Sequence, residues 1–327
     1  MPSHRFSRYT KPPENVRPPL RLTQNDISLL QLFGPQKYGY LTAATIAHLA
    51  ERNRNYVQHR LARLWYHDYV GRWHEAKDYT RGGSNPCVYW LDQRGADLLR
   101  RRYKQRAVAK DLDSGYHPHL KHSVLVDWVR AAVKHALMQH GGLQLHHEIG
   151  DKRFVDRFQA HAARMVKGKE VHRKASFKIC PDWTFALTGW RNRNKLPRSP
   201  EFYFLELQRS NRVTKNPHRH RSRHKSLRHK LESYYYFYKT KRWQDWSEKK
   251  KEQLPNFQNF RVLFVVEMGD EEMQNLIKLA CEIDEKKHGL RLFLFININS
   301  LKTNPDLILQ PVWQTPVIGD PLCSILQ

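Results

Sequence analysis

Long apolar stretches are absent from the 327-residue sequence. No run approaches the about 20 residues that a membrane-spanning helix requires. The start of the chain is basic and rich in proline, without the apolar segment of a secretory signal. The four cysteines are far apart and form no C-x-x-C pair, which argues against a disulfide scaffold or a zinc ribbon. We therefore expect a protein of the reducing cytoplasm.

Acidic residues are also scarce. The 31 Asp and Glu stand against 57 Lys and Arg, and the formal net charge is +26. A chain this basic repels itself unless a polyanion is near. Membranes also attract cations, but no amphipathic anchor or lipidation motif is visible. Nucleic acid is the better partner, because each neutralised phosphate releases a counterion. An RNA chaperone and a merely solvated basic surface stay open on composition alone.

Patterning along the chain divides it into four segments. Residues 1–20 are basic and rich in proline, and we expect them to form a disordered arm. Residues 21–105 are expected to form one compact domain, and residues 119–327 a second. The intervening residues 106–118 carry charge, Gly and Pro, which is typical of a linker. We see no internal repeats.

The first domain is predicted to be a winged helix-turn-helix. Apolar residues at helical spacing predict helices that begin near Thr23 and Thr42, and a third over residues 54–68. A β-hairpin over 69–91 and a helix over 92–105 follow, which completes the order of that fold. The polar side of the third helix and the hairpin turn supply the predicted DNA-binding residues Arg54, Asn55, Gln58, His59, Arg63 and Arg81.

The second domain is predicted to follow the order α-β-β-β-α-β, with a further helix and strand. Strands packed between helices predict a mixed sheet, so the chain as a whole combines α+β and α/β character. The stretch from the first strand to about residue 175 is expected to be polar and without strands. Predicted helices cover 119–139, 217–243 and 271–287, and predicted strands cover 143–149, 177–187, 201–208, 260–267 and 291–298.

That order matches the core of the restriction-nuclease-like, PD-(D/E)xK, fold. The fold places one acid on its second strand and an acid-x-Lys pair on its third. Here the second strand contains Asp182 and the third contains Glu206 and Gln208, which share a strand face because side chains alternate. Two carboxylates on adjacent strands can converge on Mg²⁺ or Mn²⁺. We predict that this metal ion polarises a scissile phosphate and helps to generate hydroxide from water.

The sequence departs from the pattern at Gln208, which stands in place of Lys. Gln cannot supply the positive charge that stabilises developing negative charge. Some nucleases of this fold do carry Gln there, and Lys230 on the following helix is a candidate for a migrated charge. Glu148, late in the first strand, is a candidate third metal ligand. The alternatives are a strand-end turn role for Asp182 and a surface role for Glu206.

Basic residues are densest between 191 and 230, where thirteen Lys or Arg and four His stand against two glutamates. A solvated helix face this one-sided would repel itself, so we favour a surface that grips phosphates. The His residues of this run have cations as neighbours, which oppose a metal dication. The predicted phosphate contacts are Arg219, Arg221, Arg223, Lys225 and Arg228.

Four tyrosines follow this run and invite comparison with the nucleophile of a relaxase. Leu231, Tyr234, Tyr235 and Tyr238 fall at i, i+3, i+4 and i+7. This is the spacing with which a helix buries one face on a sheet, so we expect core packing rather than catalysis.

Seven segments of the chain resemble the replication-relaxation family of plasmid-borne proteins, in the same order, over residues 21–98 and 119–266. The resemblance implies a winged-helix domain fused to a nuclease-like domain, in proteins linked to plasmid replication initiation or DNA relaxation. The chain is also similar to MobC-type mobilisation relaxases, which are thought to nick DNA with a nuclease-like domain. The family usually shows an acid where Gln208 stands. The segments are LTQNDISLLQL, RLARLWYHDYV, PCVYWLDQRGADLL, LKHSVLVDWV, PDWTFAL, FYFLELQRSN and HKLESYYYFY.

Two functional hypotheses follow, both with double-stranded DNA as partner and without a membrane. The first is metal-dependent nicking of plasmid or mobile-element DNA, which Asp182 and Glu206 favour. The second is a non-catalytic replication, transfer or regulatory factor with a degenerate nuclease fold, which Gln208 favours. Other replication or transfer proteins are further expected partners. An RNA-binding scaffold is disfavoured, because a winged helix usually reads duplex DNA.

Overall fold

The computed structural model divides the chain into two compact units, Met1–Ala131 and Ala132–Gln327. The division falls inside helix α5 (Leu120–His140). None of the helices in the described residues has the length and apolar character needed to cross a membrane. The structure describes residues 11–34, 38–73, 86–110, 119–150, 155–166, 169–191, 196–197, 200–209, 227–249, 257, 259–267, 269–284, 291–317 and 319–326.

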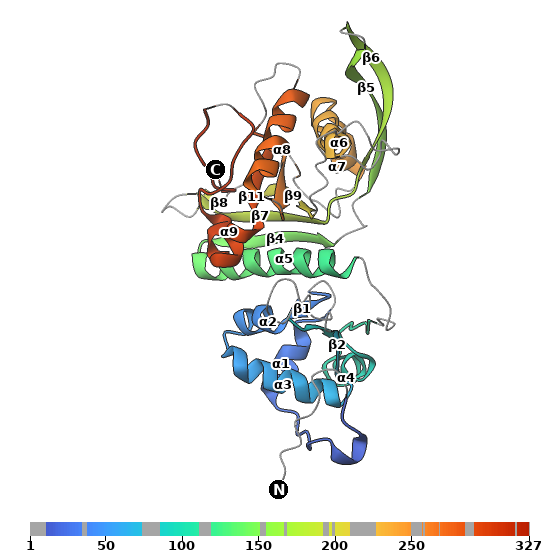
Figure 1. Ribbon diagram of the computed structural model, residues 1–327, viewed down its shortest axis with the longest axis vertical. Coiled ribbons are helices and arrows are strands. Elements are labelled where there is room, and N and C mark those ends of the chain that lie inside the picture. The colour runs from blue at the N-terminus through green and yellow to red at the C-terminus, as the bar shows by residue number, and fades with distance from the viewer. Residues whose placement is uncertain are drawn as a thin grey trace. The chain divides into compact units, whose positions relative to one another are not determined.

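The helices α1, α2, α3 and α4 of the first unit are labelled in Figure 1. Helices α1 and α2 begin at the capping residues expected from the sequence. The Thr23 side chain accepts a hydrogen bond from the backbone N–H of Asp26, and Thr42 accepts one from Thr45. Asn53 caps the third helix. The helices are η1 (Glu14–Val16), α1 (Gln24–Gln31), α2 (Ala43–Leu49), α3 (Arg54–Tyr66) and α4 (Gln93–Tyr103).

A small antiparallel sheet completes this unit, in the order β1-β3-β2. Its strands are β1 (Leu41–Thr42), β2 (Val70–Trp73) and β3 (Val88–Leu91). The hairpin of β2 and β3 agrees with the prediction. Strand β1 is an addition, because a two-residue strand has no alternation from which to predict it. The predicted contact Arg81 lies outside the described residues.

A mixed sheet forms the centre of the second unit, in the order β11-β10-β9-β7-β4, and the short β8 pairs with β7. The β10 strand is parallel to β9 and β11, whereas β7 is antiparallel to β9 and β4. The predicted mixed sheet is therefore confirmed. The strands are β4 (Leu143–Gly150), β7 (Trp183–Arg191), β8 (Leu196–Pro197), β9 (Glu201–Gln208), β10 (Phe260–Val266) and β11 (Phe293–Asn297).

Helices of the second unit bury an aromatic core against one face of this sheet. Phe204 of β9 and Phe264 of β10 pack in one cluster with Leu231 and Tyr234 of α6 and Leu276 of α8. The side-chain alternation of β9 therefore places Glu206 on the same face as this cluster. The helices are α6 (Leu227–Lys239), α7 (Arg242–Lys249), α8 (Asp270–Ile283), α9 (Ile298–Thr303) and η3 (Pro305–Leu309).

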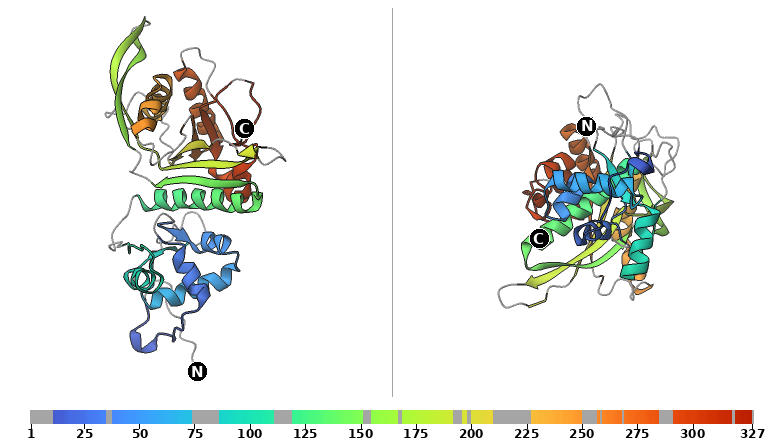
Figure 2. Two further views of the ribbon diagram at one scale, coloured as in Figure 1. Left: turned by 180° about the vertical axis from the view of Figure 1, so that it is seen from behind. Right: turned by 90° about the horizontal axis from the view of Figure 1, so that it is seen from below.

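The prediction that the stretch before residue 175 contains no strands is wrong. Two long strands, β5 (Asp156–Val166) and β6 (Lys169–Ile179), form an antiparallel hairpin there. The hairpin lies beside α6 and extends past it (Figure 2). Its apolar positions include the small residues Ala160 and Ala175, and small side chains weaken the alternation that indicates a strand.

The expectation of one bent strand over 177–187 is also wrong. The segment contains the end of β6 and the start of β7, which belong to different sheets. Pro181 lies between the two strands, where its missing N–H leaves no gap in a ladder.

The expected single helix over 217–243 is two helices, α6 and α7. The chain turns between them at Lys241, which adopts a left-handed φ of 52°. Four of the predicted phosphate contacts, Arg219, Arg221, Arg223 and Lys225, lie outside the described residues.

A buried ion pair joins α1 to α3 in the first unit. Asp26 is fully buried, and its carboxylate accepts hydrogen bonds from the Thr23 backbone (2.8 Å), Arg60 Nε (2.8 Å) and Arg60 Nη2 (2.5 Å). Burial by itself would raise the pKa of Asp26, but the hydrogen bonds from Arg60 and Thr23 outweigh it, and the pKa is lowered.

Replacement of Asp26 by Asn is expected to destabilise the first unit by about 3–5 kcal/mol, because Arg60 keeps a buried charge without its partner. The contribution of ionised Asp26 is present above its ordinary pKa of 3.8 and is lost as pH falls through the lowered folded pKa. Urea unfolding of the full chain at neutral and acidic pH measures both effects.

The matched control is Asp97→Asn, which breaks the exposed pair between Asp97 and Arg100 on α4. Solvent screens this pair, so little change in stability is expected. Equal losses in the two variants would contradict the assignment of Asp26 as a buried structural link.

Candidate active site and nucleic-acid interface

Asp182, which directly precedes β7, lies opposite Glu206 of the neighbouring strand β9. Trp183 pairs with Leu205 in the antiparallel ladder of β7 and β9, so the preceding Asp182 lies level with Glu206. The Asp182 N–H donates to the carbonyl of Leu205 (2.9 Å), and the Leu207 N–H donates to Asp182 Oδ2 (2.7 Å). These two hydrogen bonds hold the Asp182 backbone and carboxylate against β9.

The Glu206 carboxylate is buried, and helix α6 supplies partners to both of its oxygens. Lys230 Nζ lies 2.6 Å from Oε2, and the Tyr234 hydroxyl donates to Oε1 at 2.5 Å. Lys230 and Tyr234 are four residues apart and therefore share one face of the helix. The Lys230 side chain is about one-third exposed, while that of Glu206 is 2% exposed. The cluster is therefore open to solvent on the Lys230 side.

Burial raises the pKa of Glu206 to about 7, and the negative charge of Asp182 adds to this effect. Lys230 and Tyr234 oppose the rise. Burial would lower the pKa of Lys230, but Glu206 and Asp182 outweigh it, and the pKa is raised. Burial also keeps the pKa of Tyr234 well above its ordinary value, so the phenol stays protonated and donates.

The chemistry of these donors fits a divalent cation. Carboxylate oxygens of Asp182 and Glu206 are hard ligands, as is the backbone carbonyl of Leu207, and Mg²⁺ and Mn²⁺ prefer such oxygens. Asp182 and Glu206 repel each other, as the raised pKa of Glu206 shows. A cation between them would offset that repulsion.

Two other residues expected at the metal site lie differently. Gln208 is the last residue of β9, half-buried, on the same strand face as Glu206. Glu148 pairs with Phe185, and Phe185 pairs with Tyr203, whose side chain alternates to the face opposite Glu206. The Glu148 carboxylate is 2.7 Å from Lys134 of α5. The structure thus brings together Asp182, Glu206 and Lys230, and leaves Glu148 on the other face.

The predicted reading residues of α3 lie on its solvent side. Arg54, Asn55, Gln58 and His59 are exposed, and Arg63 is half-buried. The opposite side of α3 is buried through Val57, Leu61, Leu64 and Trp65.

One predicted phosphate contact of the second unit already has an acidic partner. Arg228 Nε lies 2.9 Å from Glu232 on the same helix. Its charge is therefore partly compensated within the protein.

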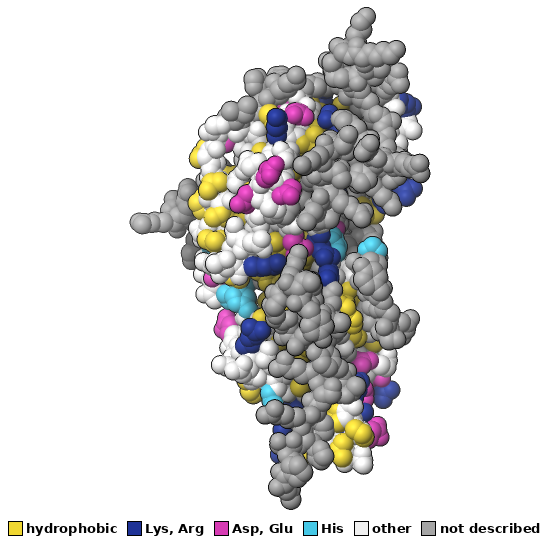
Figure 3. Space-filling model, in the orientation of Figure 1, with side chains coloured by type: hydrophobic (Ala, Val, Ile, Leu, Met, Phe, Trp, Pro, Cys, Tyr) yellow, Lys and Arg dark blue, Asp and Glu magenta, His cyan; other side chains and the backbone are white. Residues whose placement is uncertain are grey.

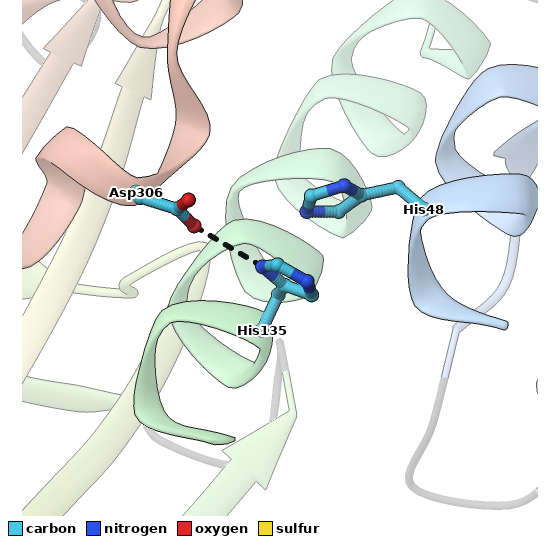
Figure 4. A group of neighbouring side chains, drawn as sticks. All are labelled: His48, His135 and Asp306. Carbon is cyan, nitrogen blue, oxygen red and sulfur yellow. Dashed lines mark hydrogen bonds and ion pairs between the residues drawn. The ribbon is translucent and has the colours of Figure 1, made fainter. Parts of the chain in front are cut away.

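A contact between a histidine and an aspartate of the second unit is drawn in Figure 4. His135 Nδ1 of α5 lies 3.1 Å from Oδ1 of Asp306 in η3. Two ligands are too few for a metal centre. His48, also drawn there, belongs to the first unit, and we assign no metal to the pair.

The model of the replication-relaxation family matches residues 36–249, which is more than half of the chain. The chain belongs to the replication-relaxation family. The match includes α2, α3, the hairpin and the strands and helix that carry Asp182, Glu206 and Lys230. It ends before β10, so the last part of the sheet lies beyond the matched residues.

Comparisons outside the replication-relaxation family add little. None of the curated proteins matches the chain significantly. One similar solved structure is restriction endonuclease FokI bound to DNA, at 11% identity and a TM-score of 0.28. The match covers 88% of this chain and 46% of the FokI chain, so this chain spans less than half of that protein. A score this low supports no argument about fold or chemistry.

Sequence reasoning missed the role of Tyr234. The tyrosine spacing predicts a buried helix face, and Tyr234 and Tyr235 are indeed buried, whereas Tyr238 is 37% exposed. Spacing says nothing about the hydroxyl group, which binds Glu206. The signal that points to it is the four-residue interval from Lys230, once Lys230 is a site candidate.

Tyr234→Phe is expected to destabilise the second unit by about 1–3 kcal/mol, because one buried oxygen of Glu206 loses its donor. Tyr238→Phe removes a hydroxyl from an exposed ring of the same helix and serves as the control, with a change within about 0.5 kcal/mol. Chemical unfolding of both variants measures the difference. Indistinguishable stabilities would show that the Tyr234 hydroxyl does not support Glu206.

Proposed function

We propose that this protein binds plasmid or mobile-element DNA during replication initiation, relaxation or mobilisation, and nicks one strand with Mg²⁺ or Mn²⁺. The observation that carries the proposal is the position of Lys230 beside Glu206, opposite Asp182. Two acids and one cation then occupy one site, as in the PD-(D/E)xK nucleases, although Gln208 replaces the lysine of the motif. Membership of the replication-relaxation family supports DNA as the substrate.

Each side chain has a distinct task in this proposal. Asp182 and Glu206 would hold the metal ion, which supplies Lewis acidity toward the scissile phosphate and an activated water. Lys230 places positive charge where negative charge develops on the phosphate. Tyr234 keeps the Glu206 carboxylate in one orientation through its hydrogen bond. Gln208 is a neutral neighbour on the same face.

Nicking is expected when purified protein meets supercoiled cognate plasmid with Mg²⁺ or Mn²⁺, and none is expected with EDTA. Asp182→Asn should abolish nicking, because an amide holds a hard cation poorly. Lys230→Gln should lower the rate by about 100-fold or more, since a charge that stabilises the transition state is removed. Glu282→Gln, an exposed change on α8, is the control and should retain the wild-type rate.

A second variant tests whether Lys230 replaces the lysine of the motif. Gln208→Lys in the Lys230→Gln background restores a cation to the same strand face and should recover part of the rate. The metal ion should also raise the melting temperature of the wild type, by the free energy RT ln(1 + [L]/Kd). If millimolar Mg²⁺ or Mn²⁺ neither shifts the melting temperature nor supports nicking, the enzymatic proposal is wrong.

The alternative is a non-catalytic DNA-binding factor, and the first unit favours DNA binding in either case. We propose that α2 and α3, with the turn between them that ends at Asn53, form the helix-turn-helix of a winged helix. The exposed residues of α3 would then contact base edges in the major groove. The sheet of β1, β2 and β3 would form the wing.

Asn55→Ala and Gln58→Ala are each expected to relax sequence preference, by about 1–3 kcal/mol of discrimination per lost contact. Gln24→Ala, an exposed change on α1, is the control. A binding-site selection assay measures the preference of each variant. Preferences that match the wild type in both α3 variants would exclude this helix as the reader.

A further inference from the structure

The β5–β6 hairpin is held firmly by its inner face. Phe158, Ala160, Phe177 and Ile179 are buried there and join the core of the second unit. The Phe177 ring stacks on His229 of α6, with ring centres 5.3 Å apart. The inner face thus fixes which side chains the hairpin turns to solvent.

The outer face of the hairpin carries basic residues directly opposite one another. In the ladder Arg157 pairs with Lys178, and His161 pairs with Lys174. All four side chains are exposed. Like charges opposite each other on adjacent strands destabilise a sheet. Among the side chains that the structure describes on this face, the third exposed pair is Gln159 and Ser176, and neither is acidic.

The cations of this face are also unpaired, whereas nearby cations have partners. Arg242 of α7 lies 3.4 Å from Asp156 at the base of the hairpin. Among the described residues, no ion pair includes Arg157, Lys174 or Lys178. Protection of a strand edge by lysine would not need cations at directly opposite positions such as Arg157 and Lys178. Such a face is stable when it meets a polyanion.

We infer that the outer face of the β5–β6 hairpin binds the phosphate backbone of duplex DNA next to the site of Asp182 and Glu206. This inference rests on the DNA binding of the proposed function. Lys178 precedes Asp182 by four positions, so the basic face begins beside the candidate metal ligand. Contacts to phosphates position a duplex without reading its sequence.

The surface of α8 shows the opposite charge. Acidic side chains gather over this helix in Figure 3, and its exposed residues include Asp270, Glu271 and Glu282. Phosphates are repelled there. Within the second unit, charge therefore favours the hairpin rather than α8 as the surface that meets DNA.

The test compares two double variants of the full chain that lose the same charge. Arg157→Gln/Lys178→Gln neutralises one opposed pair on the hairpin. Lys278→Gln/Lys302→Gln neutralises two exposed lysines elsewhere in the unit. Affinity for a duplex is measured by fluorescence anisotropy at several salt concentrations, with an unrelated duplex and a single strand of equal length beside it.

The hairpin variant should bind both duplexes more weakly and reduce the slope of log K against log salt by about 1.8, or about 0.9 for each lost contact. Its melting temperature should equal or exceed that of the wild type, because a repulsive pair is removed. The control variant should keep the wild-type slope.

Three outcomes would overturn the inference and leave DNA binding by the protein intact. The affinity of the wild type for duplex DNA should fall steeply as salt rises. If it does and both double variants keep the wild-type slope, the hairpin makes no contact with DNA, and DNA binding by the protein still stands. If the two variants lose slope equally, the effect is one of net charge. If the loss appears only with the single strand, the duplex is the wrong partner. A wild type that binds no DNA at any salt would instead refute the proposed function together with the inference.

Discussion

The buried carboxylate of Glu206 is the constraint on which the second unit depends. A charge in the middle of an aromatic core is costly unless other groups compensate it. Here α6 compensates it twice, with an ammonium group and a phenol one helical turn apart. The position of α6 on the sheet is thus set by polar contacts as well as by packing. In this arrangement the pKa of the Glu206 carboxyl is about 7, which is close to neutral pH.

Polar groups in such a core are retained although they do not maximise stability. Well-packed apolar residues in place of a buried ion pair often leave a protein equally stable. Stability alone therefore does not explain why the cluster of Glu206, Lys230 and Tyr234 is polar, and this agrees with the proposal that it is part of a metal site. The negative charge of Asp182 adds to the cost of ionised Glu206, because it raises the pKa of that carboxyl.

The sequence was sufficient to predict most regular elements and the acidic pair, and insufficient for the contacts between them. The apolar run of β9 predicts its bounds, and the threonine caps predict where α1 and α2 begin. Asp182 and Glu206 could be predicted as site residues from their places in two predicted strands. Lys230 could be predicted because the lysine of the motif is missing at Gln208. The hairpin was not predictable from alternation, because alanine and basic residues dilute it. The Tyr234 hydroxyl contact depends on how α6 is rotated over the sheet, which helical spacing alone leaves undefined.

The connection from β6 to β7 has a mechanical consequence. Only Cys180, Pro181 and Asp182 separate the end of the hairpin from the first residue of the central sheet. A proline in so short a link restricts its backbone, so the link behaves as a stiff joint rather than a slack tether. A tilt of the hairpin would therefore change the position of Asp182 relative to Glu206.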